Sequence, residues 1–230
     1  MREDITSIPI SEVFEPRDGC PICRMRDMLE ERMVEYITGA AMMESDVRQE
    51  TNRQGFCSCH YEMMMKKRNR LSLALILESH LAELEHRVFD GPPIIGKTAG
   101  KQAQSAQGSA AGCFVCAQVD KAMERMISNM CRLWENQRDF RDLFDEQTGL
   151  CLPHFSLVVQ SAKAGMNKKY APDFCKAAAA LSKSSLAGLR EDVSHFCRMF
   201  DYRNSGADAD WGNSRDAIER AVAWLTARGG

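Results

Sequence analysis

The chain carries the same cysteine and histidine pattern twice, in the order C-x2-C and then C-x2-H. The second copy follows the first by 93 residues (20 to 113) at the first motif and by 94 (60 to 154) at the last. The eight residues are Cys20, Cys23, Cys57 and His60 in the first copy, and Cys113, Cys116, Cys151 and His154 in the second. Three thiols and one imidazole from two short loops suit the tetrahedral coordination of Zn²⁺. The sequence therefore predicts two zinc ions per chain, one within each copy.

Four protein ligands leave no coordination position for a substrate, which favours a structural metal over a catalytic one. Two other kinds of site use the same residues. An iron–sulfur cluster also takes thiolate ligands, and histidine replaces cysteine in some of them. Alternatively, the pairs Cys20/Cys23 and Cys113/Cys116 are dithiols that cycle through a disulfide, with a thiolate favoured at a helix N-terminus.

The sequence around these motifs predicts an all-α protein. Apolar residues recur at three- and four-residue steps after each motif, as on one face of a helix. We expect two tandem zinc-pinned helical units packed into one body about a pseudo-two-fold axis. The expected divisions are an N-terminal arm with the first unit (1–90), a flexible linker (91–112), the second unit (113–200), and a tail with a capping helix (201–230).

Several boundaries follow from local signals. Proline favours an extended arm over residues 1–19, lying across the helical body. One long helix is expected from His60 to about Phe89, and another over 172–200. Glycine, proline and the lack of acidic residues predict the flexible linker. Ser214 suits the N-cap of the capping helix.

Composition places the chain among ordinary soluble proteins. A net charge of −2 provides no general attraction to nucleic acid or to anionic lipid. No apolar run approaches the roughly 20 residues of a membrane-spanning helix, and the N-terminus lacks the apolar core of a secretory signal. We therefore expect a cytoplasmic protein, in which ten cysteines are ligands or buried thiols rather than disulfides.

Some residues outside the eight ligands have more than one interpretation. Cys59 lies inside the first C-x2-H turn and is either a replacement ligand, a reactive thiol or a partly buried side chain. Three other cysteines fall near apolar helix faces and are expected in the core: Cys131, Cys175 and Cys197. The basic run 66–70 is interpreted as a solvated helix face, with phosphate binding as the alternative.

Three further groups of polar and aromatic residues each have two interpretations. Asp46 with Arg48 is repeated as Asp139 with Arg141. We expect ion pairs that fix the loop before each Gly-x-Cys turn, although a repeated ligand-binding pair has the same signature. His80 and His195 are expected to be hydrogen-bonded helix histidines, or else a polar pair facing each other. The segment Asp201–Asn204 and Trp211 is expected to attach the tail to the body, with a ligand pocket as the alternative.

The chain resembles an uncharacterised bacterial family known only as a domain of unknown function. The residues that carry the resemblance are Ile8-Pro9, Cys20-Pro-Ile-Cys23, Met43-Glu-Ser-Asp-Val-Arg-Gln-Glu-Thr51, Gly55-Phe-Cys57 with His60, Asn69-Arg-Leu-Ser-Leu-Ala-Leu75, Phe200-Asp-Tyr-Arg203 and Trp211-Gly-Asn-Ser-Arg-Asp-Ala217. The resemblance covers nearly the whole chain and implies a helical protein with two cysteine-bearing units. It brings no activity with it. The extra Cys59 and a longer Ala/Gly/Ser-rich linker depart from the usual pattern.

The sequence predicts a cytoplasmic binding or adaptor protein with structural zinc, and another protein as its partner. A thiol- or cluster-based redox protein is the alternative, and nucleic-acid binding through residues 66–70 is a weaker one. No phosphate-binding glycine loop, nucleophile elbow or H-E-x-x-H helix is present in the sequence, so no sequence motif indicates an enzyme class.

Overall fold

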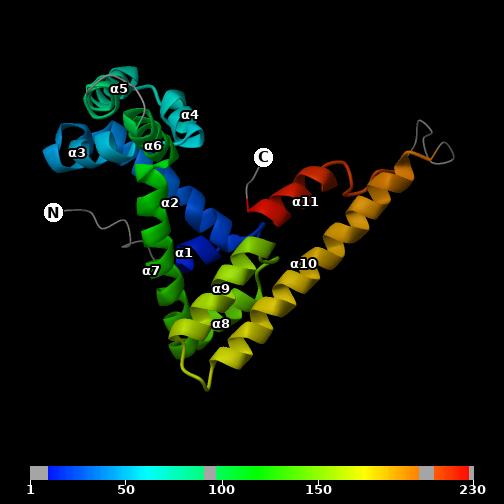
Figure 1. The fold of residues 1–230 in the computed structure, drawn as a ribbon. Coiled ribbons are helices and arrows are strands. Elements are labelled where there is room, and N and C mark those ends of the chain that lie inside the picture. Colours follow the sequence, from blue (N-terminus) through cyan, green and yellow to red (C-terminus); the bar gives the residue numbers. More distant parts are fainter. Residues whose placement is uncertain (1–9, 91–96, 202–209, 228–230) are drawn as a thin grey trace. The chain divides into compact units, whose positions relative to one another are not determined.

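The computed structural model describes residues 10–90, 97–201 and 210–227, and within these ranges the regular structure is helical with no strand (Figure 1). This confirms the all-α prediction. The elements are α1 (Ile10–Phe14), α2 (Pro21–Thr38), the 3₁₀ turn η2 (Ala40–Met43), α3 (Ser45–Gln54), α4 (Ser58–Lys66), α5 (Arg70–Leu84), the π turn η3 (Glu85–Phe89), α6 (Lys97–Ala111), α7 (Phe114–Asn136), α8 (Arg138–Asp145), α9 (Leu152–Gly165), α10 (Ala171–Met199) and α11 (Ala217–Thr226). None of the described helices is both long enough and apolar enough to cross a membrane.

The contacts divide the chain into two units whose boundaries fall inside helices. Unit 1 comprises Met1–Arg26 and Met123–Gly230, and unit 2 comprises Asp27–Ala122. Helix α2 therefore begins in unit 1 and ends in unit 2, whereas α7 begins in unit 2 and ends in unit 1. This division differs from the one expected from the linker composition. The tandem repeat of helical units and their pseudo-two-fold arrangement stay predictions.

An aromatic cluster forms the core of unit 1. Phe14 of α1 contacts Phe140 and Phe144 of α8, with ring centroids 5.2 and 6.0 Å apart. Phe174 of α10 lies 5.3 Å from Phe144 and 5.3 Å from Trp134 of α7. Helices α9, α10 and α11 pack against one another beside this cluster (Figure 1). Offset and edge-to-face aromatic contacts add about 0.5–1.5 kcal/mol each to the burial of the rings.

In unit 2, α3 packs against α5. The apolar face of α2 is buried at Leu29, Val34 and Ile37, as its sequence periodicity predicts. Arg48 of α3 donates hydrogen bonds to the carbonyl oxygens of Met42 and Leu75, while the expected ion pairs at Asp46 stay a prediction. In unit 1 the equivalent Arg141 likewise donates to backbone carbonyls, those of Trp134 and Glu135 in the last turn of α7, so both guanidinium groups bind the backbone of another helix.

The single helix expected from His60 to Phe89 is wrong, because the chain breaks at Lys67–Asn69. Lys67 forms ion pairs with Glu31 and Glu35 of α2 and adopts an extended conformation. The side chain of Asn69 then accepts a hydrogen bond from the amide of Ser72 and caps α5. The basic run 66–70 is therefore a helix-to-helix connection, not one face of a helix.

The expected flexible linker is helical over the residues of α6. Residues 91–96 lie outside the described ranges. Alanine, glutamine and lysine favour helix strongly enough to outweigh two glycines in α6. Arg87 donates a hydrogen bond of 2.7 Å to the hydroxyl of Ser109 and so fixes α6 to η3. The composition was misleading because the low hydrophobicity of this segment suits an exposed helix as well as a linker.

The two ends of the chain match the prediction in part. Residues 1–9 lie outside the described ranges, and Ile10–Phe14 form α1 rather than an extended arm. The capping helix is confirmed as α11. Its N-cap residue is Asp216, whereas Ser214 is buried and donates to the carbonyl oxygen of Trp211 at 2.6 Å.

Candidate metal centres

Four ligand atoms meet in unit 1, and we call this group site A. It consists of Cys20, Cys23, Cys151 and His154, whose ligand atoms all lie within 4.8 Å of one another. The Nδ1 atom of His154 faces the three sulfurs at 3.7 Å (Cys20), 3.3 Å (Cys23) and 3.2 Å (Cys151). The sulfurs of Cys23 and Cys151 are 3.7 Å apart.

A second group of the same composition lies in unit 2, and we call it site B. It consists of Cys57, His60, Cys113 and Cys116, again with all ligand atoms within 4.8 Å. The Nδ1 atom of His60 lies 3.1, 3.3 and 3.5 Å from the sulfurs of Cys57, Cys113 and Cys116. The sulfurs of Cys57 and Cys116 are 3.9 Å apart.

These separations fit a single tetrahedral ion. Metal–sulfur bonds of about 2.3 Å at the tetrahedral angle place two sulfurs about 3.8 Å apart. The observed 3.7 and 3.9 Å agree with that value and exclude disulfides, whose sulfurs are about 2.05 Å apart. All ten cysteines are free thiols in the structure. Each site therefore has the ligands and the spacing to hold one metal ion.

All eight predicted ligands are in these two groups, but their expected grouping within each copy is wrong. Each C-x2-C motif meets the C-x2-H motif of the other copy. In unit 2, Nε2 of His60 lies 3.9 Å from a carboxylate oxygen of Glu30. Glu30 is seven residues beyond Cys23, which is about 10 Å along the helix axis. Cys57 and His60 therefore meet α2 well past its own motif, where the start of α7 supplies the remaining thiols.

Helix starts provide the ligands of both sites. Cys57 is the N-cap residue of α4, and Cys151 is the N-cap residue of α9. The C-x2-C motifs likewise span the first turns of α2 and α7. Two positive helix ends therefore face each site, and they favour the net charge of about −1 that three thiolates, a neutral imidazole and Zn²⁺ produce. The amide of Cys116 also lies 3.5 Å from the sulfur of Cys113.

Crowding of the thiols controls their protonation. Hydrogen bonds from Cys151 and Cys23 hold the pKa of Cys20 well below its usual range. Hydrogen bonding with Cys20 raises the pKa of Cys151 to about 11, and burial raises the pKa of Cys116 well above that of an ordinary thiol. Protons therefore remain on several of these thiols at neutral pH, and an incoming metal ion must displace them.

A glycine two residues before each C-x2-H motif allows close packing of the ligand loop. Gly149 contacts α10 so closely that a Cβ atom there would lie 2.4 Å from Cβ of Ser185. Gly55 has a φ of +64°, and a Cβ atom there would lie 3.0 Å from Nε2 of His80. These close approaches explain why a residue without a Cβ atom stands at both positions.

The remaining cysteines do not join either site. Cys131 is buried at 4% exposure, as expected for a core residue. Cys175 is half-buried, whereas Cys197 is exposed, so the prediction of a core Cys197 is wrong. Cys59 is exposed on α4, beside site B but outside its four ligands.

The other candidate residues have structural contacts. His80 is buried and its Nδ1 lies 2.8 Å from the carbonyl oxygen of Asn52, which confirms a hydrogen-bonded helix histidine. Trp211 packs against Phe196 and Phe200 at 5.7 and 6.0 Å, so it attaches the tail to α10 as expected. Of the segment Asp201–Asn204, only Asp201 lies within the described ranges. A cavity of about 420 Å³ is lined by His195, Arg198, Met199 and Asp210.

Comparison with known proteins yields a family without a known activity. The family model described as "Family of unknown function (DUF6062)" matches residues 1–229, and the chain belongs to this family. No curated protein and no solved structure matches the chain.

Proposed function

For this member of a family of unknown function, we propose a helical binding protein that is held together by two structural zinc ions. The observation that carries this proposal is the convergence of three thiols and one imidazole at each site, all within 4.8 Å. Four protein ligands complete a tetrahedral shell, so each ion has no position left for substrate or water. A closed shell of this kind stabilises a fold and does not perform hydrolysis.

The spacing favours one ion per site over an iron–sulfur cluster. In a cluster with several irons the thiolates bind different iron atoms, with bridging sulfides between them. Such thiolates stand further apart than the ligands of a single ion. The sulfur separations of 3.7 and 3.9 Å support a mononuclear site, and thiolate with imidazole ligation is the combination that zinc prefers.

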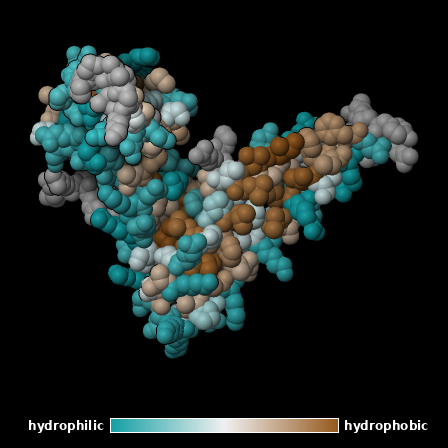
Figure 2. Space-filling view, in the orientation of Figure 1, coloured by the Kyte–Doolittle hydropathy of each residue, from teal (hydrophilic) through white to brown (hydrophobic). Residues whose placement is uncertain are grey.

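Exposed apolar side chains support binding to another protein. Ile218, Val222 and Leu225 recur along the outward side of α11 and are 48%, 53% and 55% exposed. Figure 2 shows apolar residues gathered over α10 and α11 in unit 1. A helix that is apolar on its outer as well as its inner face commonly lies in an interface. Ten free thiols support a reducing compartment such as the cytoplasm.

Metal analysis combined with cobalt substitution tests this function. We expect about two zinc ions per purified chain and a colourless protein. After replacement by Co²⁺, each site should show the visible spectrum of a tetrahedral thiolate-rich ion, and addition of azide or imidazole should leave that spectrum unchanged. A spectrum that responds to azide would mean an open coordination position. A brown protein, or a metal-free protein with readily titrated thiols, would instead favour the redox alternative.

A further inference from the structure

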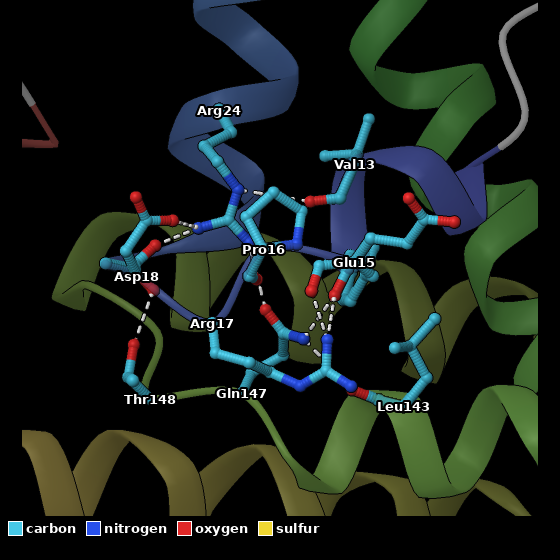
Figure 3. Close-up of polar contacts among 11 residues, drawn as sticks. Val13, Glu15, Pro16, Arg17, Asp18, Arg24, Leu143, Gln147 and Thr148 are labelled. Carbon is cyan, nitrogen blue, oxygen red and sulfur yellow. Dashed lines mark hydrogen bonds and ion pairs between the residues drawn. The ribbon is translucent and has the colours of Figure 1, made fainter.

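Side chains outside the four ligands join the two ligand-bearing loops of site A. One loop, residues 15–19 after α1, precedes Cys20, and the other, residues 146–150, precedes Cys151. Four side chains connect them: Arg17, Arg24, Gln147 and Thr148 (Figure 3). We call these four residues the site A latch.

Arg24 is the centre of the latch. It lies on α2, one residue after the ligand Cys23, and its side chain is 23% exposed. It donates to the carbonyl oxygens of Val13 at 3.1 Å and Pro16 at 2.8 Å, and it also binds Asp18 through both its carbonyl and its carboxylate. One planar group therefore fixes the whole turn before Cys20.

Gln147 extends this network to the second loop. Its side-chain oxygen accepts a hydrogen bond of 3.0 Å from Arg24, and its side-chain nitrogen donates to the carbonyl oxygens of Phe14 and Leu143 at 2.6 and 3.0 Å. Gln147 is only 4% exposed. A buried amide with its donor and its acceptor both engaged is specific for one arrangement of the two loops.

Two further contacts lie at the edges of the latch. Thr148 donates a hydrogen bond of 2.9 Å to the carbonyl oxygen of Gly19, the residue next to Cys20. Arg17 forms an ion pair with Glu146. Arg17 and Glu146 are both exposed enough that this pair contributes little to stability. The half-buried Arg24, with five hydrogen bonds, and the buried amide of Gln147 therefore dominate.

Site B is assembled differently. Its two ligand loops meet through the backbone, since the amide of Phe114 donates to the carbonyl oxygen of Gly55 at 2.9 Å. Gly112 lies so close to Gln54 that a Cβ atom would be 2.4 Å from its carbonyl oxygen. The positions that correspond to Arg24 and Gln147 are Ala117 (24 plus 93) and Arg53 (147 minus 94). The latch is therefore a property of site A.

We propose that Arg24 and Gln147 are positioning residues of site A that hold its ligand loops together before the metal ion binds. This inference rests on the proposed function, because it presupposes that site A holds a metal ion. Site A brings together Cys23 and Cys151, which are 128 residues apart in the sequence. At site B the corresponding residues, Cys57 and Cys116, are 59 residues apart. Without the latch, metal binding alone must order the two loops, and the entropy of that ordering lowers the affinity.

Zinc affinity of the full chain, with both sites intact, tests the proposal. Replacement of partners that orient metal ligands typically lowers affinity about 10–100-fold. We expect such a loss at site A in Arg24→Met and no change at site B. Arg24→Lys should behave like Arg24→Met. The single ammonium group of lysine cannot replace a guanidinium group that donates to Val13, Pro16 and Gln147 together. Arg32→Met, an exposed position on the same helix, is the matched control.

Chelator competition with cysteine-specific alkylation separates the two sites. As zinc leaves, labelling of Cys20, Cys23 and Cys151 reports site A, and labelling of Cys57, Cys113 and Cys116 reports site B. Thr148→Val removes only the hydroxyl that binds the carbonyl oxygen of Gly19. This variant tests whether the latch positions the ligands of site A if Arg24→Met does not fold. Its matched control is Thr226→Val, whose hydroxyl binds a carbonyl within α11.

The outcomes are distinct. Earlier labelling of the site A cysteines in Arg24→Met and Thr148→Val, with unchanged labelling of site B, supports the latch. Two zinc ions per chain with unchanged release from site A in both variants would overturn the latch and leave the proposed function intact. A wild-type chain without metal would overturn the proposed function itself.

Discussion

At the scale of single residues, two glycines show how the ligand loops are fitted against their neighbours. Gly149 and Gly55 each precede a C-x2-H motif by two residues, and each backbone contacts a side chain of a later helix. The sequence predicts the eight ligand identities because cysteine and histidine at this spacing have few other uses. It does not predict these packing contacts, because the local sequence around a glycine between two helices does not show whether that glycine faces solvent or a neighbouring helix.

Replacement of Gly149 by alanine should destabilise unit 1. The added Cβ atom would lie 2.4 Å from Cβ of Ser185, so the ligand loop or α10 must shift, at a cost of about 1–3 kcal/mol. Urea unfolding of the zinc-loaded protein measures this cost. Gly188→Ala is the control, since nothing lies within 4 Å of that position in α10 and alanine there should stabilise the helix. Equal stability of Gly149→Ala and the wild type would contradict the packing.

The buried Cys131 predicts a pH dependence that is independent of the metal ligands. Burial raises the pKa of this thiol to about 11 from 9.0. Below pH 9 the thiol is protonated in the folded and unfolded chains, so it has no effect on the pH dependence of stability. Above pH 9 the unfolded chain loses the proton first, and the free energy of unfolding falls until the pH passes about 11.

A comparison of the wild type with Cys131→Ala isolates this effect. The difference in free energy of unfolding between the two should be constant up to pH 9 and should move in favour of the variant between pH 9 and 11. A difference that stays constant throughout this range would show that the thiol is not buried in the folded protein.

At the scale of elements, the helix content and the bounds of α10 followed from the sequence, whereas the break between α4 and α5 did not. Helix α7 was predictable because apolar residues recur at helical spacing along its 23 residues, with no proline or glycine to interrupt them. The segment from α4 to η3 looked continuous for the same reason, yet Lys67 is held by two glutamates of α2 and ends α4 there. That interaction joins residues more than 30 positions apart, so no local pattern could reveal it.

Asn69→Ala should destabilise α5. The variant loses the hydrogen bond from Ser72 to the cap and also the donor to the carbonyl oxygen of Thr38. Loss of an asparagine cap costs about 1 kcal/mol. Thermal unfolding followed by circular dichroism measures the loss. Asn69→Asp keeps the cap acceptor and should recover part of it, whereas an Asn69→Asp variant no more stable than Asn69→Ala would argue against the capping role.

At the scale of the whole molecule, the exchange of ligands between copies is what the sequence could not predict. The repeat indicates two equivalent sites, and both the internal grouping and the exchanged grouping use the same eight residues. Only the lengths and packing of α2 and α7 decide between them, because each helix begins in one unit and ends in the other. The second unit is consequently an insertion between two parts of the first.

Metal stoichiometry in two double variants tests the exchanged grouping most directly. In Cys20→Ala with Cys151→Ala, both changes fall in site A, so the chain should keep about one zinc ion, held by site B. In Cys20→Ala with Cys57→Ala, each site loses a ligand, and the chain should retain little or no zinc. Native mass spectrometry of the purified variants counts the ions. The reverse result, with one ion retained in Cys20→Ala/Cys57→Ala and none in Cys20→Ala/Cys151→Ala, would mean that each copy binds its metal alone and would contradict this account.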